Sequence, residues 1–225
     1  MRYSALAAAG LVLTLAIFGF SDADLAVQSL FFDPRTGGWL LDKQEPVLRL
    51  VFYSGPKVLL ILFAVACLLA LLLSRRFPWA ARRRQGLVLV VLSAILVPLL
   101  VNGLKTATNV ACPSNLEAFG GPIPYVHLFE PYPPGERPAV TQRCFPCSHA
   151  TVGFALFSLI ALAETRRGRR AAAAGALAAG SIAGLYKMLI GDHFLSHVLV
   201  TLWLSLLLIE LLWLLVRRIV PDSTA

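Results

Sequence analysis

Long apolar runs separated by short polar or basic stretches form the dominant pattern of this chain. A helix needs about 17 to 25 largely apolar residues to cross the hydrocarbon core of a bilayer. The pattern predicts six such helices, at residues 4–20, 50–73, 86–104, 149–164, 171–190 and 195–216. They leave no room for a soluble domain, so we expect an all-α integral membrane protein in which residues 1–225 form a single six-helix bundle.

Two connections are too long to be simple turns. Residues 21–49 mix acidic side chains with the apolar clusters Leu30-Phe31-Phe32 and Trp39-Leu40-Leu41, a pattern typical of a segment that lies in the outer membrane interface. Residues 105–148 are rich in proline and glycine, which excludes long helices or strands. Long loops in compact proteins are usually functional, so we expect this one to form a lid or wall at the outer end of the bundle.

Composition and charge support the membrane assignment and suggest an orientation. Hydrophobic residues make up 58% of the chain and charged residues only 14%, which excludes an ordinary soluble domain. The net charge of +8 does not indicate a nucleic-acid partner, because twelve of the twenty Lys and Arg residues lie in the termini and in short basic turns. These basic stretches are Arg2, 75–84, 166–170 and 217–218. They all fall on one side, which the positive-inside rule assigns to the cytoplasm together with both termini. The first segment lacks a small-x-small cleavage pattern, so we expect an uncleaved helix rather than a signal peptide.

Ionisable side chains lie near the outer ends of the predicted helices. They are Lys105, His149, Lys187, His193 and His197. Taken singly, a lysine near a helix end usually extends its amine to the interface, and a lone histidine is weak evidence. Taken together, ionisable groups at this depth mark functional sites. Cations and imidazoles that a bundle brings to one point suit a phosphate-like anion, so we expect phosphate chemistry on the outer face.

Three short motifs in these regions are similar to those of a known family. The chain reads Lys105-x6-Cys112-Pro113, then Pro146-Cys147-Ser148-His149, then Tyr186-Lys187-x5-His193-x3-His197. This pattern resembles the type-2 phosphatidic acid phosphatase superfamily of integral membrane lipid phosphatases, whose motifs are Lys-x6-Arg-Pro, Pro-Ser-Gly-His and Ser-Arg-x5-His-x3-Asp. The resemblance covers nearly the whole chain, because the order, the spacing and the side of the membrane all agree with the family's layout.

The resemblance implies a mechanism that uses neither a metal nor a cofactor. It implies that His193 attacks phosphorus to form a phosphohistidine, while His149 acts as general acid and then as general base. It further implies that Lys105, Lys187 and Ser148 bind the phosphate oxygens, where most of the protein's contribution to phosphoryl transfer lies.

The chain departs from the family pattern at both motif arginines, which are replaced by Cys112 and Lys187. A lysine does not copy the bidentate grip of a guanidinium on phosphate. We therefore expect Arg143, shortly before the second motif, to contribute to phosphate binding.

The family's orienting aspartate is replaced by His197. A neutral His197 can accept a hydrogen bond from His193, but it supplies no negative charge to stabilise an imidazolium. Asp192, Glu117 and Glu130 are the acidic residues that could supply this charge instead.

Three outer cysteines, Cys112, Cys144 and Cys147, allow three disulfide pairings. Resemblance to a bacterial subgroup with Cys112-Pro and Cys144-Phe-Pro favours a Cys112–Cys144 disulfide, which an oxidising exterior permits. Two alternatives use the same cysteines. One is a thiol–disulfide oxidoreductase built on Cys144 and Cys147, and the other is a zinc site that adds His149 and His193.

The expected function is a lipid phosphate phosphatase of a bacterial inner membrane, with its active site facing the periplasm and a phosphorylated lipid as its partner. Family resemblance allows lipid A, undecaprenyl pyrophosphate, phosphatidylglycerol phosphate or phosphatidic acid as the substrate. Because several motif positions are substituted, a lipid phosphotransferase or an inactive phospholipid binder of the same fold is the alternative.

Overall fold

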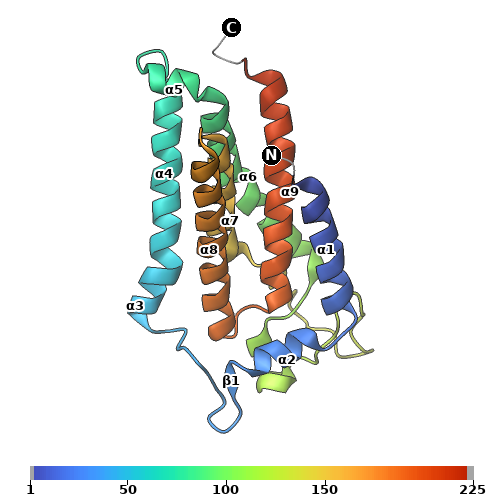
Figure 1. The fold of residues 1–225 in the computed structure, drawn as a ribbon. Coiled ribbons are helices and arrows are strands. Elements are labelled where there is room, and N and C mark those ends of the chain that lie inside the picture. Colours follow the sequence, from blue (N-terminus) through green and yellow to red (C-terminus); the bar gives the residue numbers. More distant parts are fainter. Residues whose placement is uncertain (1–2, 222–225) are drawn as a thin grey trace.

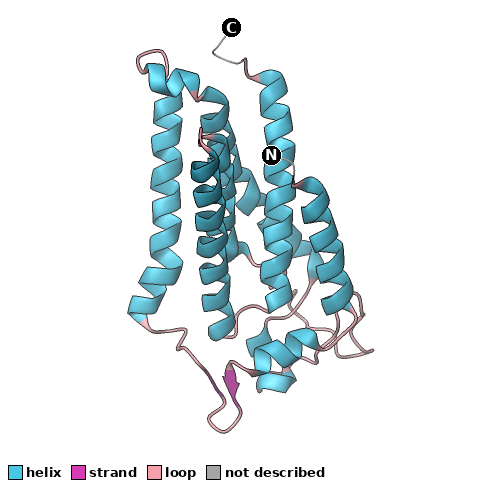
Figure 2. Ribbon diagram, in the orientation of Figure 1, coloured by secondary structure: helices cyan, strands magenta, loops and turns pink. Residues whose placement is uncertain are grey.

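The computed structural model describes residues 3–221 and is predominantly helical (Figures 1 and 2). Its α-helices are α1 (Ser4–Gly19), α2 (Ala23–Ser29), α3 (Pro46–Arg49), α4 (Gly55–Leu72), α5 (Pro78–Arg82), α6 (Arg84–Thr108), α7 (Thr151–Phe154), α8 (Arg166–Leu189) and α9 (Leu195–Ile219). Two short antiparallel strands, β1 (Phe32–Asp33) and β2 (Gly38–Trp39), pair with each other. A π-helical turn, η1 (Leu50–Ser54), precedes α4, and 3-10 turns occur at η2 (Pro113–Asn115), η3 (Glu117–Phe119), η4 (Ser148–Ala150) and η5 (Ala155–Ala161).

Several of these helices are long and apolar enough to cross a membrane. Four qualify within the described residues, at Pro46–Leu72, Arg84–Asn115, Arg166–Leu189 and Leu195–Ile219. A fifth is obtained if α1 and α2, which meet at an angle of 80°, are counted as one broken span. A predominantly helical fold with four to five candidate membrane spans is therefore confirmed, while the six-span bundle stays a prediction.

The fourth predicted span, at residues 149–164, differs most from the regular membrane-spanning α-helix that its sequence indicates. It forms a shorter apolar helix, Ser148–Ala161, of which half is the 3-10 turn η5. A 3-10 helix rises about 2.0 Å per residue against 1.5 Å for an α-helix, so this segment reaches farther than its length suggests. It lies at the centre of the bundle, where Phe154 is 1% exposed.

Close packing around this central segment depends on small residues. A Cβ atom added to Gly153 would lie 2.0 Å from the Gly180 backbone nitrogen, and one added to Gly180 would overlap the Phe154 ring. On the next turn of α8, Gly184 faces Val198 of α9 at similarly short range. Small residues let membrane helices approach closely. One face of the Ala- and Gly-rich helix packs closely against the bundle, as predicted, whereas Leu177, Ile182 and Leu185 on its other face are exposed.

The N-terminal segment folds across one end of the bundle. Helix α1 packs along α9, where the Trp203 indole donates a hydrogen bond of 3.0 Å to the Thr14 hydroxyl. Helix α2 then turns beneath the bundle in Figure 1, and the buried Gln28 side chain donates a 2.8 Å hydrogen bond to the Met188 carbonyl at the end of α8. Helix α2 and the residues that follow it as far as Lys43 thus lie over the ends of helices α8 and α9.

The start of α4 is distorted where the sequence reads Gly55-Pro56. Proline carries no backbone N–H, so a bond from residue 56 to the Phe52 carbonyl is not formed. The Gly55 N–H instead bonds the carbonyl of Leu50, five residues back, which closes the π-helical turn η1. This turn lies beside the candidate site described below.

Candidate active site

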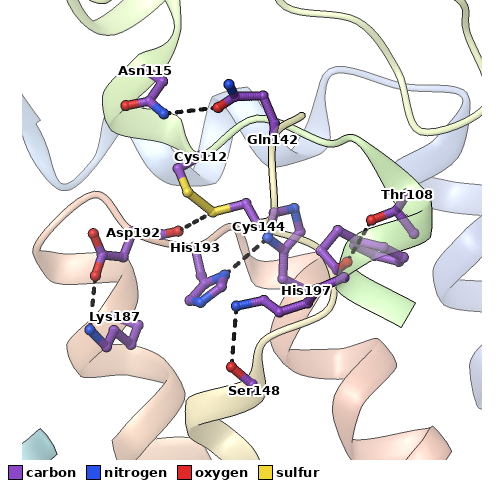
Figure 3. Close-up of a disulfide and its surroundings, with 12 residues drawn as sticks. Thr108, Cys112, Asn115, Gln142, Cys144, Ser148, Lys187, Asp192, His193 and His197 are labelled. Atoms are coloured by element: carbon purple, nitrogen blue, oxygen red, sulfur yellow. Dashed lines mark hydrogen bonds and ion pairs between the residues drawn. A yellow bond between two sulfur atoms is a disulfide. The ribbon is translucent and has the colours of Figure 1, made fainter. Parts of the chain in front are cut away.

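The three sequence motifs meet at the end of the bundle opposite the basic connections (Figure 1). The connection through α5 and the C-terminal end of α9 lie at the top of the view, and the connection from α8 to α9 lies at the bottom. The motifs come from the end of α6, from η4 and from the α8–α9 connection, so chain segments far apart in sequence form one cluster (Figure 3).

His193 and His197 form a buried pair. Gly191, with φ of 74°, ends α8 in the left-handed region that glycine tolerates best, and the His193 N–H then bonds the Lys187 carbonyl at 3.2 Å. The two Nδ1 atoms are 3.3 Å apart, so one ring donates and the other accepts, and each is at most 3% exposed (Figure 3). If His193 is the donor, its Nε2 keeps a free lone pair.

The environment of His193 favours its neutral form. Burial is the largest cause, and the neighbouring His197 and Lys105 act in the same direction, so the pKa of His193 lies well below its usual value. Within residues 3–221 its hydrogen-bonded ring partner is His197 and not a carboxylate. The three acidic residues considered above therefore do not pair with it.

His149 lies on the other side of the site. Its ring centroid is 6.5 Å from that of His193 and 4.5 Å from that of Tyr53. Its Nδ1 atom is buried and has no hydrogen-bond partner among the described residues. An atom placed between the two imidazoles needs about 3 Å to each of them. The 6.5 Å between the ring centroids of His149 and His193 is comparable with the sum of these two distances.

Two lysines supply positive charge close to the imidazoles. The Lys105 amine donates a hydrogen bond of 3.2 Å to the Ser148 hydroxyl, which ties α6 to η4. Lys187 is only 4% exposed, and its amine lies 2.8 Å from one carboxylate oxygen of Asp192. The second Asp192 oxygen lies 2.6 Å from the amine of Lys43, in the N-terminal segment.

Asp192 is held ionised by these two contacts. Burial acts to raise its pKa, but the charges and hydrogen bonds of Lys187 and Lys43 outweigh it, so the pKa of Asp192 lies below its usual value. The carboxylate therefore balances part of the lysine charge.

Cys112 and Cys144 form a disulfide (Figure 3). It joins the end of the first motif, just after α6, to the chain two residues before the second motif. The Cys144 sulfur also lies 2.7 Å from the Asp192 carbonyl oxygen. Since a disulfide sulfur carries no hydrogen, this close contact is not a conventional hydrogen bond. Cys147 is a free, buried thiol.

This pairing bears on both cysteine alternatives. An oxidoreductase would use Cys144 and Cys147 as its redox pair, but Cys144 is bonded to Cys112 and Cys147 is a free thiol. Cys144, His193 and His197 have potential ligand atoms within 4.8 Å of one another. The sulfur of Cys144 is bonded to Cys112 and is not a thiolate, so this donor set does not fit a zinc site.

A cavity of about 310 Å³ opens beside His149 and Lys187. Its lining residues are Lys43, Gln44, Arg49, Tyr53, His149, Tyr186, Lys187, Ile190 and Asp192. Arg143, expected from the sequence to bind phosphate, is exposed and is not among them. Sequence reasoning missed Lys43, Arg49 and Tyr53. The sequence did contain a signal for the two cations. Lys43 and Arg49 lie in a connection on the outer side, where the positive-inside rule does not explain positive charge.

Asp24 is a second residue that the motifs did not indicate. Its buried carboxylate accepts hydrogen bonds from the backbone N–H and the hydroxyl of Ser196, in the first turn of α9. It fixes α2 against the helix start that carries His197, and so acts on the position of the histidine pair.

An apolar groove of about 480 Å³ runs along the bundle from the same region. It lies between η1 and α4 on one side and α7, η5 and α8 on the other, and includes Val51, Phe52, Leu156 and Ile182. The Phe52 ring stacks at 5.2 Å on Tyr186, a lining residue of the polar cavity. This aromatic pair therefore has one ring in the wall of the groove and the other in the wall of the cavity.

Long apolar helices and a cluster of histidines and lysines at one end of the bundle place this chain in the class of integral membrane proteins with a candidate phosphate site. Residues 86–221, more than half of the chain, match the family model of the PAP2 superfamily, and the protein belongs to that superfamily. Its members are typically phosphatases, which supports a phosphatase-type hydrolase function. Comparison with curated proteins and with solved structures gives no significant match.

Proposed function

We propose that this protein is a lipid phosphate phosphatase that hydrolyses a phosphomonoester or pyrophosphate head group at the outer face of a bacterial inner membrane. The observation that carries the proposal is the adjacency of a cationic cavity containing His149 and Lys187 to an apolar groove that opens along the helices. A phosphorylated lipid has these two chemistries in the same order, a charged head group followed by an apolar chain.

In the first step, the lone pair of His193 Nε2 attacks the phosphorus atom. The bond from phosphorus to the leaving oxygen breaks, and protonated His149 donates its proton to that oxygen. The products are a phosphohistidine and the leaving lipid, which is an alcohol if the substrate is a phosphomonoester and a lipid monophosphate if it is a pyrophosphate. Lys105 and Lys187 neutralise the non-bridging oxygens, with Ser148 as a further hydrogen-bond donor.

In the second step, neutral His149 removes a proton from water as the water oxygen attacks the phosphohistidine. The nitrogen–phosphorus bond breaks, inorganic phosphate leaves, and both histidines return to their starting forms. Hydrogen bonding between the two Nδ1 atoms supports the proposal that His197 orients His193. Because His197 carries no negative charge when neutral, it positions the ring without stabilising an imidazolium as a carboxylate would.

Orientation in the membrane follows from the basic connections. The arginine-rich turns lie at the end of the bundle away from the cavity, and such turns face the cytoplasm in inner-membrane proteins. We therefore assign the cavity to the periplasmic face, with both termini in the cytoplasm.

The test is phosphate release by the purified protein in detergent with a chelator present. The substrates are lipid A, undecaprenyl pyrophosphate, phosphatidylglycerol phosphate and phosphatidic acid. We expect release from at least one lipid, and loss of release in both His193→Ala and His149→Ala. His127→Ala is the matched control, because this histidine lies in the outer loop in contact with Asp22 and Glu130.

Three outcomes would contradict the proposal. Activity abolished by the chelator would oppose a metal-independent reaction, and release retained in His193→Ala would oppose the phosphohistidine. Transfer of phosphate to a second lipid without free phosphate would identify a phosphotransferase of the same fold.

A further inference from the structure

A tyrosine outside the three motifs contacts two residues of the proposed mechanism. The Tyr53 ring centroid lies 4.5 Å from that of His149 and 4.7 Å from the Lys187 amine. Tyr53 lines the cavity together with both of them. Tyrosines are common at membrane interfaces, where they act as anchors. An anchor needs no contact with either residue, so these two contacts indicate a further role.

The π-helical turn η1 determines where the Tyr53 ring lies. Its closing bond runs from the Gly55 N–H to the Leu50 carbonyl. A Cβ atom on residue 55 would lie 2.6 Å from that carbonyl oxygen, so this turn requires glycine. Single π-helical turns inside α-helices are frequent at functional sites. The turn therefore fixes Tyr53 at a defined place in the cavity wall.

The first proposed step needs a proton on His149, and the charges around this ring oppose one. The charged side chains that act on it are three cations and one carboxylate, namely Lys57, Lys105, Lys187 and Asp192. The other imidazole of the site, His193, lies 6.5 Å away and carries no negative charge. The carboxylate of Asp192 is already paired with two lysine amines. Like charges disfavour a protonated imidazole, so another group has to stabilise it.

The Tyr53 ring can stabilise this proton without adding a charge. The face of an aromatic ring carries the negative part of its quadrupole and attracts cations within about 6 Å of the ring centroid. A protonated His149 and the Lys187 amine both lie within that range. A second carboxylate at this place would also stabilise them, but it would repel a phosphate. A neutral aromatic ring therefore suits a cavity that has to accept an anion.

We propose that Tyr53 is a positioning residue that holds His149 protonated and in place to transfer its proton to the leaving oxygen. This inference rests on the proposed function, in which His149 is the general acid. The reaction stays as described above, and Tyr53 neither gains nor loses a proton. Because the ring is the part that acts, phenylalanine can replace tyrosine at this position, whereas an aliphatic side chain cannot.

The first test compares two substrates that differ in their need for an acid. The p-nitrophenolate ion leaves readily without a proton, whereas the alkoxide of dodecyl phosphate needs one. For Tyr53→Leu, measured on the full-length protein in detergent, we expect kcat/KM to fall about tenfold or more for dodecyl phosphate. The loss for p-nitrophenyl phosphate should be less than about threefold, and Tyr53→Phe should stay within about twofold of the wild type on both. Tyr132→Leu is the matched control, because this tyrosine of the outer loop lines a different cavity.

The pH dependence of kcat/KM is the second readout, because it reports the essential acid of the free enzyme. Without the Tyr53 ring, His149 should lose its proton at lower pH. The basic limb of the profile should therefore shift to lower pH by about 0.5–1 unit in Tyr53→Leu. A purely structural role would lower activity equally at every pH and on both substrates. Equal losses on the two substrates, or a basic limb that does not move, would overturn the inference.

Titration of the His149 ring by nuclear magnetic resonance separates this inference from the proposed function. The ring signal is assigned by comparison with His149→Gln, and inorganic phosphate is present throughout. A titration midpoint at lower pH in Tyr53→Leu than in Tyr53→Phe supports the inference even if no lipid is hydrolysed. If the two midpoints coincide, the inference fails whether or not the protein is a phosphatase.

Discussion

Replacement of Gly153 by alanine tests whether the close contact between α7 and α8 sets the geometry of the site. The added Cβ would lie 2.0 Å from the Gly180 nitrogen and 2.3 Å from the Ala179 carbonyl carbon. Both are backbone atoms of α8, which no side-chain rotation can move away. Ordinary van der Waals contact begins near 3.4 Å, so α8 has to retreat by about 1.4 Å.

This displacement separates two parts of the candidate site. His149 lies one turn before Gly153, and Lys187 lies two turns after Gly180 on α8. Overpacking of this kind costs about 1–3 kcal/mol of stability. Misplacement of reacting groups by about 1 Å can reduce turnover about 100-fold. We therefore expect Gly153→Ala to lower the midpoint of thermal unfolding and to reduce kcat much more than this loss of stability implies.

Gly175→Ala is the matched control, because it lies on α8 and a Cβ there meets no atom within 4 Å. It should leave activity unchanged, and stability equal or higher by up to about 1 kcal/mol because alanine favours the helix. The assay is thermal unfolding in detergent together with phosphate release from the best substrate of the four lipids. A Gly153→Ala protein with wild-type midpoint and wild-type kcat would refute the argument that α7 and α8 are in backbone contact.

Two further predictions concern the disulfide and the histidine pair. Reduction of Cys112–Cys144, or the double change Cys112→Ser with Cys144→Ser, should cost about 3–4 kcal/mol, because the bond closes a loop with a sequence separation of 32. Unfolding midpoints with and without reductant measure this loss, and a midpoint insensitive to reductant in the wild type would contradict it. The depressed pKa of His193 means that the unfolded chain binds this proton more readily than the folded one, so stability should fall as the pH drops below about 6.5. The wild type should therefore lose more stability between pH 7.5 and pH 5 than His193→Gln does, and parallel pH curves would show that His193 does not contribute.

The motif residues were identified from the sequence because their signal is local. Lys105, His149, Lys187 and His193 are polar positions in apolar surroundings, and their spacing within each motif is readable without a fold. The family they indicated is confirmed. Their catalytic roles stay predictions until the histidine variants are measured.

The residues that the sequence did not reveal act through contacts between distant segments. Asp24 reaches Ser196 across 172 positions, and Lys43 reaches Asp192 across 149. Arg143 is nearer in sequence to His149 than Arg49 is, yet Arg49 lines the cavity. Proximity along the chain is a poor guide where a long loop separates a residue from the helix ends.

The sequence by itself determined the membrane environment, the helical class and the motif positions, because bilayer thickness and backbone hydrogen bonding leave few alternatives to long apolar helices. Only the tertiary structure decided that residues 43–53 form a wall of the site, with Tyr53 against His149 and with Lys43 and Arg49 in the cavity lining. The physical reason is that apolar periodicity fixes which faces of a helix are buried, whereas the packing of α2 and of Lys43 across the bundle end depends on single long-range hydrogen bonds and ion pairs. Such contacts leave no periodic pattern in the chain.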